Sequence, residues 1–320
     1  MKIEGKKIKV IHKSRRFLLG LFLILGLGTF SQVYSLTFPM PEHGDIVGEI
    51  QTTIVRKGES LSDIGRRYDI GVYEMIEANP KLDPWVPTVG AIVVVPTQFI
   101  LPNVPRVGLV LNLAEMRLYY YHADKRLITT HPLGIGKKGW GSPLGQTTVT
   151  RKQKDPPWYP PHSIHQEHIA NGDPLPAVVA GGIPANPLGR YALYLNSHGL
   201  AGKGSFLIHG TNRPAGIGVR GTHGCIRLYP EDIESLFYKV PIGTPVRIIH
   251  EPYKVGWHKK HLYLESHQPL SESQYAGSDS LARLEKLIAS VISQEGGYMV
   301  NWASAKMAAK SANGYPMRID

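Results

Sequence analysis

Apolar residues alternate with other residues along the stretch from residue 107 to residue 133. The first run places Val107, Leu109, Leu111 and Leu113 at every second position. Two more strand-like runs follow at residues 117–121 and 127–133, each after a polar turn. Because side chains alternate between the two faces of a strand, short strands about ten residues apart predict a β-rich sandwich or barrel. Strand character returns at residues 206–249, around one helix predicted at 230–238.

The segment of residues 51–97 shows a different spacing. Residues 52–55 are strand-like, and residues 91–95 form a second apolar run that Pro96 ends. Between these runs, apolar residues at helical spacing indicate one helix from Leu61 to Tyr68 and another from Val72 to Ile76. The order strand, helix, helix, strand predicts a small βααβ unit in front of the β-rich region.

Three other segments lack a regular pattern. Residues 36–50 form a polar lead-in that contains proline. Residues 134–145 are rich in glycine and residues 155–161 are rich in proline. Neither of the last two segments is expected to form a regular central element of the sheet.

The second half of the chain carries simpler expectations. In the helix at 230–238, Glu231 and Asp232 occupy the first turn, where the helix dipole favours acidic side chains. Residues 261–266 alternate like a strand that pairs with residues 253–257. Residues 279–292 have the pattern of an amphipathic helix, for which we expect a packing role.

The N-terminus combines a basic stretch with a short apolar run. The net charge of the chain is +11, and residues 1–16 carry +6 of it. The rest shows no basic stripe, so we expect no nucleic-acid partner. The apolar run at residues 17–27 falls within the ~7–15 residues of a signal peptide and below the ~20 that span a bilayer. We predict a signal peptide at residues 1–35, with an uncleaved membrane anchor as the alternative, and in either case we expect the rest of the chain to leave the cytoplasm.

Cys225 is the only cysteine, so an exported chain of this sequence cannot form an internal disulfide. It ends the run Thr222-His223-Gly224-Cys225, in which small residues let backbone amides approach a substrate carbonyl. A thiol needs an adjacent base or cation to attack near neutral pH. His209 can supply this base from a neighbouring strand if residues 210–221 form the connecting loop. On an extended strand His223 would face the same side as Cys225, and we expect the amides of residues 223–225 to form an oxyanion hole.

The residue types alone leave two other interpretations open. His209, His223 and Cys225 are all able to bind zinc, although no fourth ligand is in view. The other interpretation is that of two core histidines beside an inert thiol. Of these possibilities the nucleophilic one is favoured by the glycine-rich frame, so we predict no metal and no cofactor.

A second group of chemistry-bearing residues follows the proline-rich segment. His162, His165 and His168 recur at a spacing of three, which would give a metal-binding face on a helix. The preceding prolines favour a solvated loop instead. For Trp158 and Tyr159 we expect packing under the proline-rich loop rather than a place in a substrate groove.

The run Val55-Arg-Lys-Gly-Glu-Ser-Leu61, the pair Asn79-Pro80 and the run Gly90 to Pro96 resemble a LysM module. The resemblance covers residues 51–97. It implies binding of glycan strands that contain N-acetylglucosamine, above all those of peptidoglycan.

The catalytic region carries its own resemblance. Its marks are Ile208-His209-Gly210, Thr222-His223-Gly224-Cys225, Gly136, Ser142-Pro143-Leu144-Gly145 and Gly189-Arg190-Tyr191-Ala192-Leu193. Residues 105–249 thereby resemble the L,D-transpeptidase (YkuD-like) catalytic domain, a β-sandwich family of cysteine acyltransferases. Ser142 replaces the usual Thr, and Arg227 stands where many members have Asn. With Arg at this position the chain resembles the subgroup of the family that is found in Gram-negative periplasms. This resemblance implies a periplasmic location, with the inner membrane as the site of an uncleaved anchor, and it implies that residues 250–320 are a C-terminal extension.

The resemblance implies a mechanism. Cys225 would attack the carbonyl of the L-centre of meso-diaminopimelate in a tetrapeptide stem, D-alanine would leave, and His209 would manage the protons. An amine would then attack the acyl-thioester. Thr222, His223 and Gly224 would shape the site, and Arg227 would pair either with a substrate carboxylate or with a structural partner.

Several functions share this acyl-enzyme. An amine of a second stem gives a 3–3 cross-link, a lysine of an outer-membrane lipoprotein anchors that protein, water makes a carboxypeptidase and a D-amino acid gives exchange. The main competing class is a cysteine hydrolase of the NlpC type, in which the cysteine precedes its histidines. Here His209 precedes Cys225, which favours the transpeptidase. A non-catalytic LysM wall-binding protein would leave the cysteine cluster unexplained.

Overall fold

A nine-stranded sheet is the largest element of the computed structural model, which describes residues 35–201, 206–273, 280–293 and 299–320. The described residues belong to one unit, Val33–Asp320. In sheet order the strands are β1 (Leu36–Pro39), β8 (Leu127–Pro132), β7 (Arg117–Tyr121), β6 (Gly108–Asn112), β15 (Pro245–Ile249), β10 (Gly145–Lys154), β11 (Tyr191–Leu195), β12 (Leu207–His209) and β14 (Ile226–Arg227). The predicted signal peptide lies outside the described residues, except for Ser35.

The long strand β10 divides this sheet into two halves. Its first four residues, Gly145–Thr148, pair with β15, and its residues from Val149 onward pair with β11, with an irregularity between Val149 and Arg151. One apolar core holds side chains from both halves, including Leu109, Leu118, Leu193 and Ile208. The two halves therefore enclose a common core in the manner of a sandwich, which agrees with the mainly β fold expected from the sequence.

The predicted βααβ unit consists of β3 (Gln51–Ile54), α1 (Leu61–Arg67), α2 (Val72–Ala78) and β4 (Ile92–Val95), with β3 and β4 paired antiparallel. Ser60 caps α1 through a capping box with Asp63. The core of this unit continues into Val110, Tyr119 and Tyr121 of β6 and β7. Strands β6 and β7 are therefore buried on both faces, one against the sandwich core and one against the βααβ unit.

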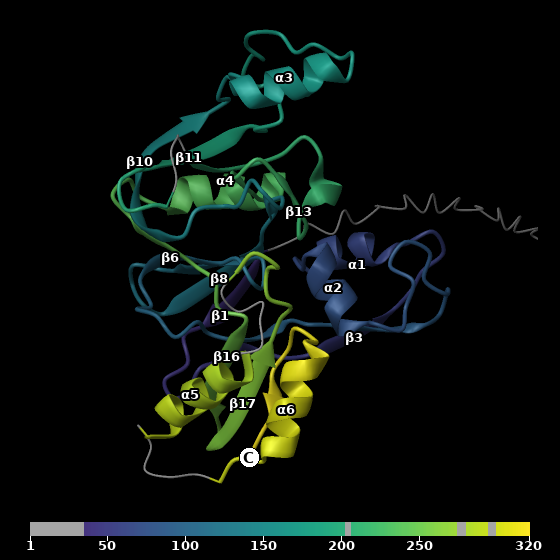
Figure 1. Cartoon of the computed structure of the whole chain (residues 1–320), viewed down its shortest axis with the longest axis vertical. Coiled ribbons are helices and arrows are strands. Elements are labelled where there is room, and N and C mark those ends of the chain that lie inside the picture. Colours follow the sequence, from purple (N-terminus) through teal and green to yellow (C-terminus); the bar gives the residue numbers. More distant parts are fainter. Residues whose placement is uncertain (1–34, 202–205, 274–279, 294–298) are drawn as a thin grey trace, which may run out of the picture. The chain divides into compact units, whose positions relative to one another are not determined.

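The C-terminal region forms a small separate core. Strands β16 (Tyr253–His258) and β17 (His261–Ser266) pair as predicted, and β18 (Met317–Arg318) joins them. Helices α5 (Ser280–Ser293) and α6 (Trp302–Ser311) flank this sheet (Figure 1), and side chains such as Leu284, Ile288 and Ala305 fill the space between. The packing role expected for the helix at 279–292 is confirmed for its described part.

Two segments without a regular sequence pattern form regular structure, and the loop expected around His162, His165 and His168 is wrong. Residues 36–50 contain β1 and β2 (Ile46–Gly48), which find partners far along the chain in β8 and β5 (Gln98–Ile100). Residues 162–170 form helix α3 (His162–Ala170) rather than a loop. The proline at 161 stands at the N-cap of α3, where it leaves the helical hydrogen bonds intact. Within the described residues, no helix is both long and apolar enough to cross a membrane.

Candidate active site

His209 ends strand β12, and Cys225 stands immediately before β14, the parallel neighbour of β12 in the large sheet. Strand β12 pairs with β14 so that Ile208 lies opposite Ile226 and His209 opposite Arg227. Extended by one residue, this register sets Cys225 beside Leu207, whose backbone also hydrogen-bonds the thiol. Residues 207 and 209 point to the same face of their strand, so Cys225 and His209 share that face. The neighbouring-strand arrangement expected from the sequence is confirmed.

The His209 ring is buried, and its tautomer is set by the next residue. Its Nδ1 lies 2.7 Å from the carbonyl oxygen of Gly210. A carbonyl oxygen can only accept, so Nδ1 carries the proton of the neutral ring and Nε2 keeps its lone pair. Burial, and next the charge of Arg227, lower the pKa of His209 to about 4. The ring is therefore neutral near pH 7 and is able to accept a proton.

Cys225 sits in a turn that Thr222 organises. Thr222 Oγ1 donates to the carbonyl oxygen of Cys225 at 2.6 Å and accepts the N–H of Gly224 at 3.2 Å. Gly224 has a φ of 100°, a conformation that side chains disfavour, so glycine is required where the chain turns into β14. Burial raises the pKa of the Cys225 thiol, while the Leu207 backbone and Arg227 act in the other direction. The resting pair is thus a neutral thiol and a neutral imidazole.

His223 does not lie on an extended strand with Cys225, because β13 (Arg220–Thr222) ends before it. Its Nε2 lies 2.9 Å from Glu167 Oε2 of α3, and its ring packs edge-on against Trp140 with centroids 5.0 Å apart. Lys137 Nζ lies 3.3 Å from the other oxygen of Glu167. The His223 bond, and next that of Lys137, lower the pKa of Glu167. Sequence patterns did not indicate Glu167 as a partner of His223, because residues 162–170 were expected to form a loop.

Two cavities flank the catalytic turn. The larger, about 690 Å³, is lined by Cys225 together with aromatic and apolar side chains such as Trp158, Tyr159, Tyr194 and Leu188. The smaller, about 300 Å³, is lined by His223, Arg227, Arg213, Asn212 and again Trp158. Trp158 thus separates two spaces, and Tyr159 is 68% exposed. The expectation of packing under the proline-rich loop is wrong for Tyr159, whereas Trp158 is partly buried, bridges to Val179 and lines both cavities.

Arg227 lines the smaller cavity, and one nitrogen of its guanidinium group lacks a hydrogen bond among the described residues. Its Nε is buried and has no hydrogen-bond partner among the described residues. Burial lowers the pKa of Arg227, and the nearby Arg213 acts in the same direction. Two cations beside one cavity favour an anionic ligand, and a carboxylate would satisfy the orphaned donor.

The zinc interpretation of this cluster finds no support in the described part of the chain. There, groups of three or more convergent His, Cys, Asp or Glu side chains occur at two places, and neither includes His209, His223 or Cys225. Neither of these two groups includes a histidine of α3. None of the residues of α3 is buried.

Comparison with known proteins decides the family. The sequence model of the YkuD family, described as an L,D-transpeptidase catalytic domain, matches residues 106–248, and that of the LysM domain matches residues 53–96. Over 302 residues the chain is 39% identical to the probable L,D-transpeptidase YbiS of Escherichia coli K12, with 92% of this chain and 95% of that protein covered. The chain belongs to the L,D-transpeptidase family.

A second relative agrees with this assignment. The probable L,D-transpeptidase YcfS of the same strain is 43% identical over 241 residues, which is 74% of each chain. Among solved structures, the chain is similar to the NMR structure of the catalytic domain from the E. faecium L,D-transpeptidase, with 22% identity and a TM-score of 0.34 over 46% of this chain and 100% of that one. The prediction of a transpeptidase enzyme with a LysM domain and a mainly β, YkuD-like fold is confirmed.

Proposed function

We propose that this L,D-transpeptidase forms an acyl-enzyme on Cys225 with a tetrapeptide stem of peptidoglycan. The thiol attacks the carbonyl at the L-centre of diaminopimelate, and its proton passes to Nε2 of His209. The tetrahedral adduct collapses, the amine of D-alanine leaves with that proton, and a thioester remains on Cys225. The observation that carries this proposal is the parallel pairing of β12 and β14, which gives both side chains one face of the sheet.

The second half-reaction returns the enzyme to its resting state. An incoming amine gives its proton to His209 as it attacks the thioester, and Cys225 leaves as a thiolate that recovers a proton from His209. The hydrogen bond from Nδ1 to Gly210 keeps Nε2 available in both steps. His209 therefore acts as base and then as acid in each half-reaction.

The remaining predicted residues position the substrate. Gly224 N–H already has an acceptor in Thr222, so we assign the oxyanion contacts to the amides of His223 and Cys225. Arg227 binds a carboxylate of the stem in the smaller cavity, where its Nε lacks a partner among the described residues. The larger cavity beside Cys225 takes the less polar part of the stem.

We assign the other segments of the chain to export and to binding of the cell wall. Residues 51–97 bind glycan strands as a LysM module, residues 105–249 form the catalytic domain and residues 250–320 extend it. Residues 1–35 direct export to the periplasm, where peptidoglycan is the substrate. The acyl acceptor is an amine of a second stem or a lysine of an outer-membrane lipoprotein.

The test is release of D-alanine from a disaccharide-tetrapeptide. Wild type should release it, Cys225→Ala should release none, and His209→Gln should be slower by roughly 100-fold or more because it loses general acid–base catalysis. His198→Gln, in an exposed loop after β11, is the matched control and should behave like wild type.

Adding acceptors one at a time then separates the functions. A stem dimer or a peptide–lysine conjugate identifies transfer, whereas free tripeptide alone identifies a carboxypeptidase. Full activity in Cys225→Ala, or equal losses in the His209 and His198 variants, would contradict the proposed mechanism.

A further inference from the structure

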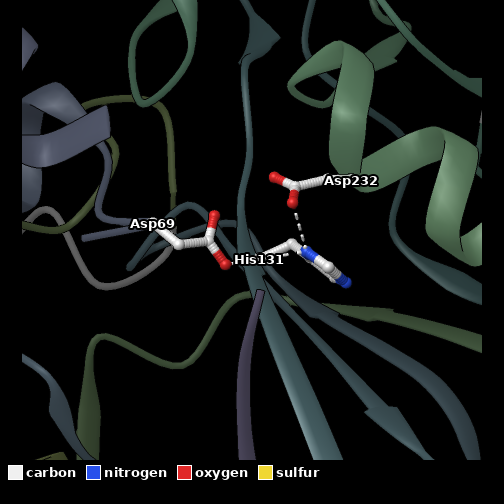
Figure 2. Close-up of side chains that lie close together, drawn as sticks. All are labelled: Asp69, His131 and Asp232. Atoms are coloured by element: carbon white, nitrogen blue, oxygen red, sulfur yellow. Dashed lines mark ion pairs between the residues drawn. The ribbon is translucent and has the colours of Figure 1, made fainter. Parts of the chain in front are cut away.

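Asp69, His131 and Asp232 meet in the interior from three separate elements. Asp69 follows α1, His131 lies in β8, and Asp232 lies in the first turn of α4 (Pro230–Lys239). His131 Nδ1 lies 3.0 Å from Asp232 Oδ1 and 3.7 Å from Asp69 Oδ2. Figure 2 shows the carboxyl group of Asp69 to the left of His131 and that of Asp232 above it, both on the side of the ring that carries Nδ1. All three residues are at most 1% exposed.

These side chains carry buried polar atoms without hydrogen-bond partners in the described residues. The atoms are Asp69 Oδ1, Asp232 Oδ2 and both ring nitrogens of His131. The short contact between His131 Nδ1 and Asp232 therefore does not have hydrogen-bond geometry. Buried polar atoms are almost always satisfied, so several orphans in one cluster point to a missing ligand.

Another buried group of carboxylates in this chain is neutralised by a lysine, but Asp69 and Asp232 have no such cation among the described residues. Elsewhere in the interior, Glu115 and Glu265 hold Lys254 Nζ at 2.6 and 2.7 Å. The carboxyl groups of Asp69 and Asp232 have no Lys or Arg ion pair in the described part of the chain. The guanidinium of Arg117 pairs with Glu74 and hydrogen-bonds Asp69 only at its backbone carbonyl. Two buried carboxyl groups thus face a histidine without a fixed positive charge.

We propose that Asp69, His131 and Asp232 bind one Zn²⁺ ion. An imidazole nitrogen with two carboxylate oxygens suits zinc and disfavours magnesium or calcium, which prefer oxygen ligands alone. Bonds of zinc to nitrogen and oxygen place tetrahedral ligand atoms about 3.4 Å apart. The two distances from His131 Nδ1, 3.0 and 3.7 Å, lie on either side of that spacing.

The protonation states are compatible with a metal ligand set. Burial lowers the pKa of His131 to about 4, so its ring is neutral and has a lone pair for a metal. Burial raises the pKa of Asp232 to about 7 and that of Asp69 well above its ordinary value. Zinc would displace protons from these carboxyl groups. A proton shared between the two carboxyl groups is the competing occupant.

The consequence of zinc binding would be a fixed contact between the LysM domain and the catalytic domain. Asp69 belongs to the LysM match, whereas His131 and Asp232 belong to the catalytic match. Close by, the N–H groups of Val72 and Tyr73 donate to the carbonyls of Ile217 and Gly218. Those two residues lie in the loop between His209 and Cys225. Zinc would therefore hold the LysM domain against the loop that joins the two catalytic residues.

The experiment titrates metal-free full-length protein with Zn²⁺ in a Cys225→Ala background, which removes the active-site thiol as a ligand. Native mass spectrometry should show one zinc per chain, and zinc should raise the unfolding temperature. Asp232→Asn and His131→Gln should each weaken zinc binding by roughly 100-fold or more. Loss of a residue that only hydrogen-bonds to a metal ligand already weakens binding by about 10–100-fold, and loss of the ligand itself should cost at least as much. Glu231→Gln is the matched control, because this neighbour pairs with Arg66 outside the cluster.

Cobalt gives a readout that needs no variant of the cluster. Co²⁺ added to the Cys225→Ala protein should produce the visible absorption of a four-coordinate site, and Zn²⁺ should remove it. Absence of zinc binding to this protein would overturn the proposal and leave a shared proton in the cluster. Binding of equal strength in the His131→Gln or Asp232→Asn variant would overturn it as well.

Discussion

Arg117 in β7 and Glu74 in α2 form a buried ion pair between the catalytic domain and the LysM domain. Arg117 Nε lies 2.7 Å from Glu74 Oε1, and the side chains are 0% and 4% exposed. The other guanidinium nitrogens donate to Thr130 Oγ1 and to the Asp69 carbonyl. Every nitrogen of the Arg117 guanidinium therefore has an acceptor, which is the condition under which a buried charge is tolerated.

Arg117→Met should destabilise the protein strongly because it leaves the Glu74 carboxylate buried and unpaired. We expect a loss of about 3–5 kcal/mol. Arg126→Met removes an arginine whose side chain is 82% exposed, and it should change stability by less than ~0.5 kcal/mol. Thermal unfolding followed by circular dichroism compares the two variants. Equal melting temperatures would show that the buried pair does not hold the domains together.

Gly218→Ala should loosen the LysM domain from the active-site loop. Gly218 has a φ of 80°, and a Cβ there would lie 2.2 Å from the backbone nitrogen of Val72. Gly216, in the same loop, has open space around its Cβ position and serves as the control. Limited proteolysis should cut Gly218→Ala between the domains well before wild type or Gly216→Ala. Identical digestion of both variants would refute the contact.

The pH dependence should show that His209 and Cys225 rest as a neutral pair. The pKa of His209, lowered to about 4 by burial, makes the ring a competent base above that pH, so turnover should be flat from about pH 5.5 to 8.5. The raised pKa of Cys225 means that alkylation by iodoacetamide, which needs the thiolate, should still be increasing above pH 9. An alkylation rate that levels off near neutral pH would instead indicate a thiolate–imidazolium pair.

Stability should fall at alkaline pH because of His267, which links the C-terminal region to the LysM domain. Burial would lower its pKa, but hydrogen bonds to Glu265 and Glu77, at 2.8 and 3.1 Å, raise it to about 10. Since the folded pKa exceeds the ordinary 6.5, the stabilisation is complete below pH 6.5 and is lost as pH rises through 10.

Melting temperatures of wild type and His267→Gln at pH 6.5 and pH 9.5 test this assignment. Wild type should lose at least about 3 °C more than the variant between the two pH values. Lys254 and Glu115 lie in the same network and are unchanged in both proteins, so the difference reports His267. Equal decreases in melting temperature in the two proteins would exclude His267 as the cause of the alkaline loss of stability.

Local patterns were sufficient to predict most strands and the placement of His209 and Cys225 at neighbouring strands. The alternation around Leu109 and Leu118 and the helical spacing after Ser60 specify elements whose partners are near in sequence. His209 and Cys225 could be placed on neighbouring strands because one glycine-rich loop separates them. In each case the hydrogen-bond partner or the connecting loop is visible within about twenty residues, which is where sequence patterns are most informative.

Features that depend on distant partners could not be predicted in this way. Strand β1 is defined by its pairing with β8, in the register Leu36 to Thr130. Asp232 was interpreted as a helix-dipole acid, yet it is buried against His131 and Asp69. Nothing in the sequence around Asp69 indicates burial, because its neighbours in space are supplied by the other domain. Glu167 was missed for the same reason, since its partner His223 is 56 residues away.

The most direct test of the central claim is intact-protein mass spectrometry of wild type incubated with a disaccharide-tetrapeptide in the absence of an acceptor amine. We expect a covalent adduct with the mass of the stem minus D-alanine, located on Cys225 by peptide mapping. The adduct should be absent in Cys225→Ala and should disappear when an acceptor amine is added to wild type. D-alanine release without any adduct, or an adduct mapped to another residue, would contradict an acyl-enzyme on Cys225.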